Sequence, residues 1–249
     1  MKLNRLFSAV LFILTGMLMA CQERLPTSFK AKIEQSLPRE ILNKMAMYDI
    51  DQYAPIMMRF FKEDNIAEIW KQNRSGVFVL VVSYGICKWS GQLGPKYREG
   101  DFQAPEGFYT VQENQMNPYS KYYLSFNIGF PNLYDQIHGR TGSYLMVHGA
   151  CASVGCYSMN DRNMAQIYAF ARDAFRGGQK EFQLHAFPFR MTDANMQRHY
   201  TNPHYEFWMM LKEGYDFFEK NRKPPKITVY DKRYVFEHFI DENSVAVAL

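Results

Sequence analysis

The stretch that decides the fold is His148–Cys156, "HGACASVGC", which follows the apolar run "SYLMV" at 143–147. The apolar run predicts a short buried strand that ends at His148. After the stretch, "DRNMAQIYAFARDAF" (161–175) has apolar residues at helical spacing and predicts a helix. Between strand and helix, one histidine, two cysteines and one serine lie among small residues. They are compatible with a nucleophile and its base, a metal site, half of a disulfide, or a tight turn beside the core.

Strand signals dominate the flanks of this stretch. A hairpin is predicted where "IMMRFF" and "IAEIW" are separated by "KEDN", and a second hairpin is predicted near the C-terminus. Helical patterns occur at 27–48, where Pro38 breaks the segment, and at 202–220. We therefore predict a mainly β or α+β fold, with further strands at 76–87, 107–113, 121–129, 181–187 and within 226–239.

The N-terminus has the pattern of a bacterial lipoprotein signal. A basic start, "MKLNR", precedes an apolar run and Cys21, and the run is too short to span a bilayer comfortably. The pattern predicts removal of residues 1–20 and lipidation of Cys21, with an ordinary secretory signal as the alternative. Gln22 resembles the sorting signal for the outer membrane, so we expect a periplasmic protein with a lipid anchor.

Charge excludes one class of partner. The chain of 249 residues carries 29 basic and 25 acidic side chains, and loss of Lys2 and Arg5 would leave 29 − 2 − 25 = +2. These charges are dispersed, so no nucleic-acid partner is predicted. With 47% hydrophobic residues the chain can build a sizeable core.

Cys156 has the surroundings of a nucleophile. A cysteine attacks as the thiolate, which a nearby imidazole such as that of His148 can generate. Gly155 permits a sharp turn, and the predicted helix would bring backbone amides close to the sulfur. A buried inert thiol is the alternative. A zinc site would need a fourth ligand besides His148, Cys151 and Cys156, and a Cys151–Cys156 disulfide would close a very short loop.

The cysteine pairing stays open at this stage. Cys87 could pair with Cys151 if strands bring the two together, or both could be free thiols. Motifs of other hydrolases and acyltransferases, such as S-x-x-K, G-x-S-x-G and H-E-x-x-H, do not occur.

Several motifs together resemble one family. "HG" at a strand end followed by "SVGC", and "GDFQAPEGFYTV" (100–111) with Ala104 in place of threonine, resemble the L,D-transpeptidases with a YkuD-type catalytic domain. The segments "ICKWSGQLGPKYREGDF", "NIGFPNLYD" and "FPFRMTDANMQRH" are similar to the YafK-like branch. The resemblance covers roughly 54–235. It implies a β-sandwich-like catalytic domain at 54–190, preceded by a helical tether at 21–53 and followed by a helical extension at 191–249 that packs on the domain.

The resemblance assigns roles to residues of the opening stretch. Cys156 matches the nucleophile, His148 the base, and Ser153 the serine or threonine of the motif. The Gly149 carbonyl is expected to orient the imidazole. The backbone amides of Cys156 and Tyr157, with Gly155 giving room, are the predicted oxyanion hole.

Two departures from the family pattern matter. Ser158 stands where many members have an arginine that contacts substrate, so a substrate carboxylate would be bound elsewhere; Arg190, Arg140, Arg98 and Tyr144 are the candidates. The spacing from His148 to Cys156 is 156 − 148 = 8, whereas His138, at 156 − 138 = 18, fits the longer spacing of the broader family. We favour His148 because it ends an apolar strand.

The resemblance implies a peptidoglycan enzyme that needs no metal or cofactor. The expected substrate is a stem peptide containing meso-diaminopimelate, and the expected activity is acyl transfer through Cys156. An amidase that releases a wall-attached lipoprotein is the alternative within the same chemistry. An inactive wall-binding lipoprotein is the alternative outside it.

Overall fold

The computed structural model describes residues 25–237, so the predicted signal peptide and Cys21 lie outside the described residues. A five-stranded sheet forms the centre, in the order β3-β2-β1-β9-β4. Its strands are β1 (Ile56–Phe61), β2 (Ile66–Gln72), β3 (Phe78–Gly85), β4 (Gly107–Gln112) and β9 (Glu181–Phe187). The predicted strands at these positions are confirmed, including the β1–β2 hairpin.

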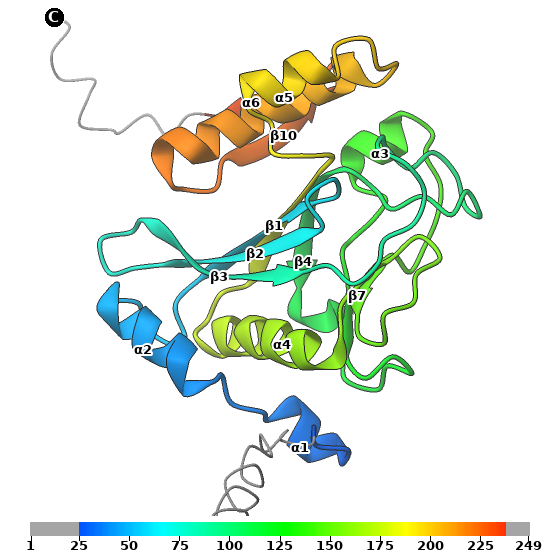
Figure 1. The fold of residues 1–249 in the computed structure, drawn as a ribbon. Helices are drawn as coiled ribbons and strands as arrows, with labels where there is room; N and C mark the ends of the chain where they lie inside the picture. Colours follow the sequence, from blue (N-terminus) through cyan, green and yellow to red (C-terminus); the bar gives the residue numbers. More distant parts are fainter. Residues whose placement is uncertain (1–24, 238–249) are drawn as a thin grey trace, which may run out of the picture.

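Strand β1 is buried on both faces, because a layer covers each side of the sheet (Figure 1). Met58 and Phe60 pack with helix α4 (Asp161–Arg176) in the main core. Phe61 faces the opposite side, toward helix α6 (Tyr205–Asn221). A parallel β1–β9 pair lies between two antiparallel pairs, and β1 is buried along its whole length.

The C-terminal layer contains the helices α5 (Asp193–Arg198) and α6 and the hairpin of β10 (Lys226–Tyr230) and β11 (Arg233–Glu237). This hairpin was predicted. Helix α6 begins three residues later than Asn202, with His204 as its N-cap. Among the residues at 25–237, no helix is long and apolar enough to cross a membrane.

A second, four-stranded sheet carries the opening stretch. Its order is β5 (Met116–Asn117), β6 (Ser125–Asn127), β7 (Met146–His148) and β8 (Tyr157–Ser158), with the short 3-10 helix η1 (Glu113–Gln115) before it. The predicted strand at 143–147 is shorter than expected, because it starts only at Met146, but it runs through His148. The predicted strand at 121–129 is likewise reduced to three residues.

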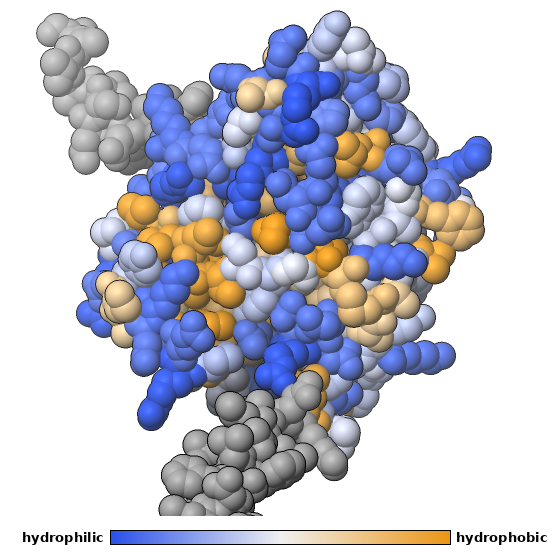
Figure 2. Space-filling model, in the orientation of Figure 1, coloured by the Kyte–Doolittle hydropathy of each residue, from blue (hydrophilic) through white to orange (hydrophobic). Residues whose placement is uncertain are grey.

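The N-terminal segment forms two short helices, α1 (Phe29–Ile33) and α2 (Arg39–Met47). The break predicted at Pro38 is confirmed, because Pro38 is the N-cap of α2. The helix α3 (Leu133–Ile137) was not predicted. Polar side chains cover most of the face drawn in Figure 2, with apolar patches across its middle.

Candidate active site

The pairing of β7 with β8 places His148 and Cys156 on one face of the small sheet. The two strands are parallel, with Val147 opposite Tyr157 and His148 opposite Ser158. Cys156 directly precedes β8, so it lies beside Met146, and its Sγ accepts a hydrogen bond from the Met146 amide at 3.4 Å. His148 lies two residues further along β7, about 7 Å of strand, on the same face as Met146. Cys156 and His148 therefore lie on adjoining segments of the β7–β8 pair, two residues apart in register.

His148 is held in one orientation and kept from water. Its Nδ1 lies 2.5 Å from the Gly149 carbonyl oxygen, and this contact requires a proton on Nδ1. Nε2 is then the atom able to accept a proton. The side chain is 3% exposed, and burial lowers the pKa of His148 although the Gly149 contact acts in the opposite direction. The imidazole is therefore neutral at pH 7, as a base must be.

The thiol of Cys156 is a protonated group in the resting protein. Burial raises the pKa of Cys156, while the Met146 amide and the charge of Lys96 lower it in part. Lys96 is itself buried and paired with Asp101. A protonated thiol beside a neutral imidazole means that the proton must move when the nucleophile reacts.

A serine pair shapes the turn before Cys156. Ser153 Oγ donates to the Cys156 carbonyl at 2.6 Å and lies 3.1 Å from Ser90 Oγ, which in turn accepts a hydrogen bond from the Gly155 amide. Gly155 has a φ of +107°, a conformation that favours glycine. Ser153 thus holds the backbone of the turn, and Ser90 was missed because nothing in its own sequence neighbourhood links it to residue 155.

The expectation of helix-start amides at the sulfur is wrong. Helix α4 begins at Asp161, with Asn160 as its cap, and β8 separates it from Cys156. Tyr157 is fully buried in the β7–β8 ladder, and its hydroxyl donates to the Pro105 carbonyl at 2.7 Å. The Tyr157 side chain is therefore structural, and the backbone amides of Cys156 and Tyr157, beside Gly155, stay a prediction for the oxyanion hole.

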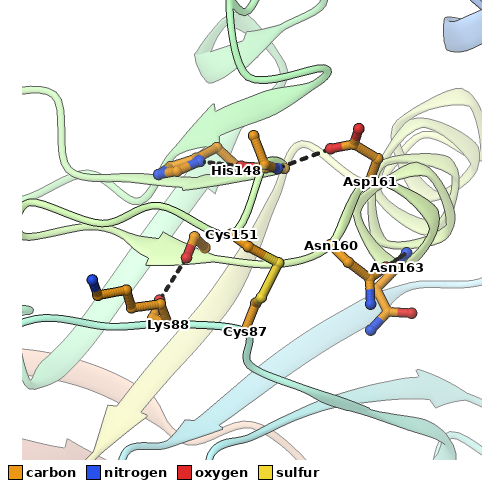
Figure 3. Close-up of a disulfide and its surroundings, with 10 residues drawn as sticks. Cys87, Lys88, His148, Cys151, Asn160, Asp161 and Asn163 are labelled. Atoms are coloured by element: carbon orange, nitrogen blue, oxygen red, sulfur yellow. Dashed lines mark hydrogen bonds between the residues drawn. A yellow bond between two sulfur atoms is a disulfide. The ribbon is translucent and has the colours of Figure 1, made fainter.

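A disulfide joins Cys87 and Cys151, with 5.2 Å between the two Cα atoms (Figure 3). It ties the segment after β3 to the turn after β7, and it leaves Cys156 as a free thiol. This settles the pairing that the sequence left open and excludes the Cys151–Cys156 disulfide. Within residues 25–237, no group of three histidine, cysteine or acidic side chains could hold a metal ion.

The amino-acid sequence of this chain matches known proteins. Residues 58–177 match the family model described as YkuD, the L,D-transpeptidase catalytic domain. "Putative L,D-transpeptidase YafK" from Escherichia coli K12 is 49% identical over 182 residues, which are 73% of this chain and 74% of that protein. The chain belongs to the L,D-transpeptidase family. The same figures hold for the protein of that name from E. coli O157:H7.

Two solved structures are more distant from this chain. The cell shape determining protein Pgp2 of Campylobacter jejuni is 18% identical, with a TM-score of 0.43, over 77% of this chain and 80% of that one. Bd1075 of Bdellovibrio bacteriovorus is 16% identical, with a TM-score of 0.40, over 74% and 85% of the two chains. The family assignment depends on the sequence matches alone.

Two arginines predicted to bind substrate are paired with carboxylates in the structure. Arg140 is buried and pairs with Asp135 at 2.8 Å. Arg190 pairs with Glu68 at 2.7 Å and stacks on Phe61, on the α6 side of the large sheet. Each guanidinium already has a carboxylate partner, which favours a structural role, and a substrate contact for either arginine stays a prediction.

The remaining candidates divide by position. Tyr144 is 79% exposed, and its carbonyl lies 3.8 Å from Cys156 Sγ, so it borders the site. His138 ends α3, where its Nδ1 contacts the Tyr134 carbonyl and its ring packs on Tyr134. Ser158 is fully buried and donates to the Lys88 carbonyl, so it cannot replace the family's arginine. The geometry favours His148 over His138 as the base.

Proposed function

We propose that this L,D-transpeptidase family member is a cysteine acyltransferase that acts on peptidoglycan stem peptides containing meso-diaminopimelate. The observation that carries the proposal is the parallel pairing of β7 with β8, which brings Cys156 beside Met146 and within two residues of His148, whose Nδ1 contacts the Gly149 carbonyl. A family match alone would also fit a chain that has lost its activity. The intact pair favours an active enzyme over an inactive wall-binding lipoprotein.

The first half of the proposed reaction forms a thioester. His148 Nε2 takes the proton of the Cys156 thiol as the sulfur attacks the carbonyl carbon of the L-centre of meso-diaminopimelate. The carbon–nitrogen bond of the scissile amide then breaks, and the imidazolium gives its proton to the departing amine. The Cys156 amide is placed to donate to the oxyanion at this step.

The second half regenerates the enzyme. An acceptor amine attacks the thioester carbonyl, His148 takes a proton from this amine, and the thiol is restored with a new amide bond. Neither step uses a metal or a cofactor.

Hydrolysis is the second candidate function, and one observation favours it. Cys156 is partly exposed, and Tyr144 and Val154 near it are 79% and 72% exposed, so water can reach a thioester at this site. With water as the acceptor, the enzyme would act as an amidase, and a wall-attached lipoprotein is the substrate that we propose for this activity.

Muropeptide mass spectrometry of cells expressing wild-type protein, Cys156→Ala, His148→Ala or His138→Ala tests the proposal. New cross-links between two diaminopimelate residues indicate transfer, and loss of lipoprotein-linked muropeptides indicates the amidase. We expect the change to vanish in Cys156→Ala and His148→Ala and to persist in His138→Ala. A Cys156→Ala profile identical to that of the wild type would falsify the proposed nucleophile.

We also propose that a lipid on Cys21 anchors the enzyme to the outer membrane, facing the periplasm. The signal pattern of residues 1–22 supports this location. Labelling with a palmitate analogue should mark the wild type and not Cys21→Ala. Equal labelling of both would refute the anchor.

A further inference from the structure

We propose that α1 is a positioning element for the active site. It holds residues 118–124, named here the Tyr122 loop, so that the Tyr122 ring stays against the His148 imidazole. The inference rests on the proposed function in one respect, namely that His148 and Cys156 are the reacting pair. It adds that a segment more than 100 residues earlier in the chain controls the position of His148.

The Tyr122 loop touches His148 in two ways. The ring of Tyr122 lies 4.8 Å from the imidazole, measured between centroids, with 33° between the ring planes. The Tyr122 carbonyl accepts a hydrogen bond at 3.0 Å from the amide of Gly149, the residue whose own carbonyl holds His148 Nδ1. A shift of this loop would therefore move both the cover of the imidazole and the group that orients it.

Side chains of helix α1 contact the Tyr122 loop. Phe29 stacks on Tyr119, with 4.5 Å between ring centroids and 13° between planes. Lys32 Nζ donates to the Tyr123 carbonyl at 3.1 Å and lies 5.4 Å from the centre of the Tyr123 ring. Two stacked rings, a charge-assisted hydrogen bond and a cation–π contact converge on a loop of seven residues.

Helix α4 fixes α1 in turn. Arg172 Nη1 donates to the carbonyls of Ile33 and Gln35 at 2.7 and 2.9 Å. Arg176 makes a bidentate pair with Glu34 at 2.7 and 2.9 Å. Helix α1 lies below α4 at the bottom of the molecule (Figure 1) and buries no residue of its own. Only Ile33 of α1 packs against the main core, as a partly buried residue, and the other contacts of α1 connect α4 to the Tyr122 loop.

The mechanical consequence concerns His148. Tyr123 has a φ of +68°, so the loop adopts a conformation that a non-glycine residue keeps only where contacts hold it. Lys32 supplies such a contact at the same residue. Loss of the contacts between α1 and the Tyr122 loop should let the Tyr122 ring move and make the orientation of the His148 imidazole less fixed. Proton transfer from the Cys156 thiol should then be slower, whereas the binding of substrate elsewhere should not change.

The test compares Lys32→Met with Lys30→Ala, since Lys30 is an exposed lysine on the same helix. Alkylation of Cys156 by iodoacetamide at pH 7 reports how well the imidazole activates the thiol, and turnover of a disaccharide-tetrapeptide gives kcat and KM. We expect Lys32→Met to slow alkylation and lower kcat about fivefold or more, with little change in KM. Lys30→Ala should match the wild type, and Lys32→Arg, which retains the donor, should recover most of the rate.

A double-mutant cycle separates this role from general stability. If α1 acts through Tyr122, Lys32→Met should cause no further loss in a Tyr122→Ala background. Equal rates for Lys32→Met and Lys30→Ala, or full additivity with Tyr122→Ala, would overturn the inference. Circular dichroism checks that the variants are folded, and Phe29→Leu serves as a second variant should Lys32→Met unfold. If Cys156→Ala keeps full turnover, the proposed function fails. The alkylation rates of Lys32→Met and Lys30→Ala, which both retain Cys156, still test whether α1 positions the active site.

Discussion

The carbonyl oxygen of Gly149 lies 2.5 Å from Nδ1 of His148, so a backbone group adjacent in sequence fixes the tautomer of the imidazole. A carbonyl oxygen rather than a carboxylate performs this task; its hydrogen bond raises the pKa of His148, but it has no full charge that would raise this pKa further. Burial therefore prevails and lowers the pKa of His148.

The first prediction concerns pH. Neutral His148 is the active form, so kcat/KM should rise with pH through the lowered pKa of His148 and reach its plateau from a limb centred below 6.5. Because burial raises the pKa of Cys156 above its ordinary 9.0, the thiol stays protonated and the plateau should extend to about pH 9. His138→Ala should leave the profile unchanged. An acidic limb centred above 6.5 would contradict the lowered pKa of His148.

The sequence predicted those helices and strands that have a clear hydrophobic periodicity and their own turn or cap residues. The β1–β2 hairpin, β9 and α4 have strong periodicity and clear turn or cap residues, and all are present. Strand β8 has two residues and exists only because β7 and the bridge to Lys88 flank it, so no window of sequence predicts it. The expectation that helix amides reach Cys156 failed for this reason.

The motif could locate candidate residues but not the contacts that surround them. The motif located Cys156, His148 and Ser153. It could not show that Arg190 meets Glu68, 122 residues earlier, or that Lys96 places its charge near the thiol. Such pairings depend on how the chain folds back on itself, which a single sequence does not reveal.

The second prediction concerns the disulfide. Cys87 and Cys151 are 64 residues apart, so their bond restricts the unfolded chain and should stabilise the fold by about 4 kcal/mol. Urea unfolding of the wild type with and without reductant measures this difference. Cys156→Ser should show the same effect of reductant, and Cys87→Ser should show none. An unchanged midpoint on reduction of the wild type would contradict the stabilising role.

The third prediction concerns a buried ion pair that connects the large sheet to α6. Lys62 Nζ lies 3.0 Å from Glu106 Oε1, both side chains are fully buried, and Glu106 Oε2 accepts from Trp208 Nε1 at 2.8 Å. Glu106→Gln leaves the ammonium without its counter-charge and should cost about 3 to 5 kcal/mol at pH 7.

The sign of its pH dependence follows from Lys62. Burial lowers the pKa of Lys62, and removal of Glu106 removes the larger of the two charges that oppose this shift, the other being that of Asp101. The unfolded chain then binds more protons than the folded one, so the stability of Glu106→Gln should rise between pH 7 and pH 10. The double variant Lys62→Met, Glu106→Gln lacks the ammonium and should not show this rise. Urea midpoints across this range decide the point, and a flat profile for Glu106→Gln would oppose it.

The fourth prediction concerns Gly149. A Cβ at this residue would lie 2.5 Å from Asp161 Oδ1, 2.8 Å from the Tyr122 carbonyl oxygen and 3.1 Å from Tyr123 Cβ. Asp161 Oδ1 also accepts a hydrogen bond from the Ala150 amide at 2.8 Å, so it cannot move away from the new Cβ without losing that hydrogen bond. Gly149→Ala must therefore displace the carbonyl that orients His148, and we expect kcat to fall about tenfold or more.

Gly85→Ala is the matched control, because a Cβ at Gly85 meets no atom within 4 Å among the described residues. Activity in Gly149→Ala equal to that in Gly85→Ala would show that the position of this carbonyl does not limit the reaction.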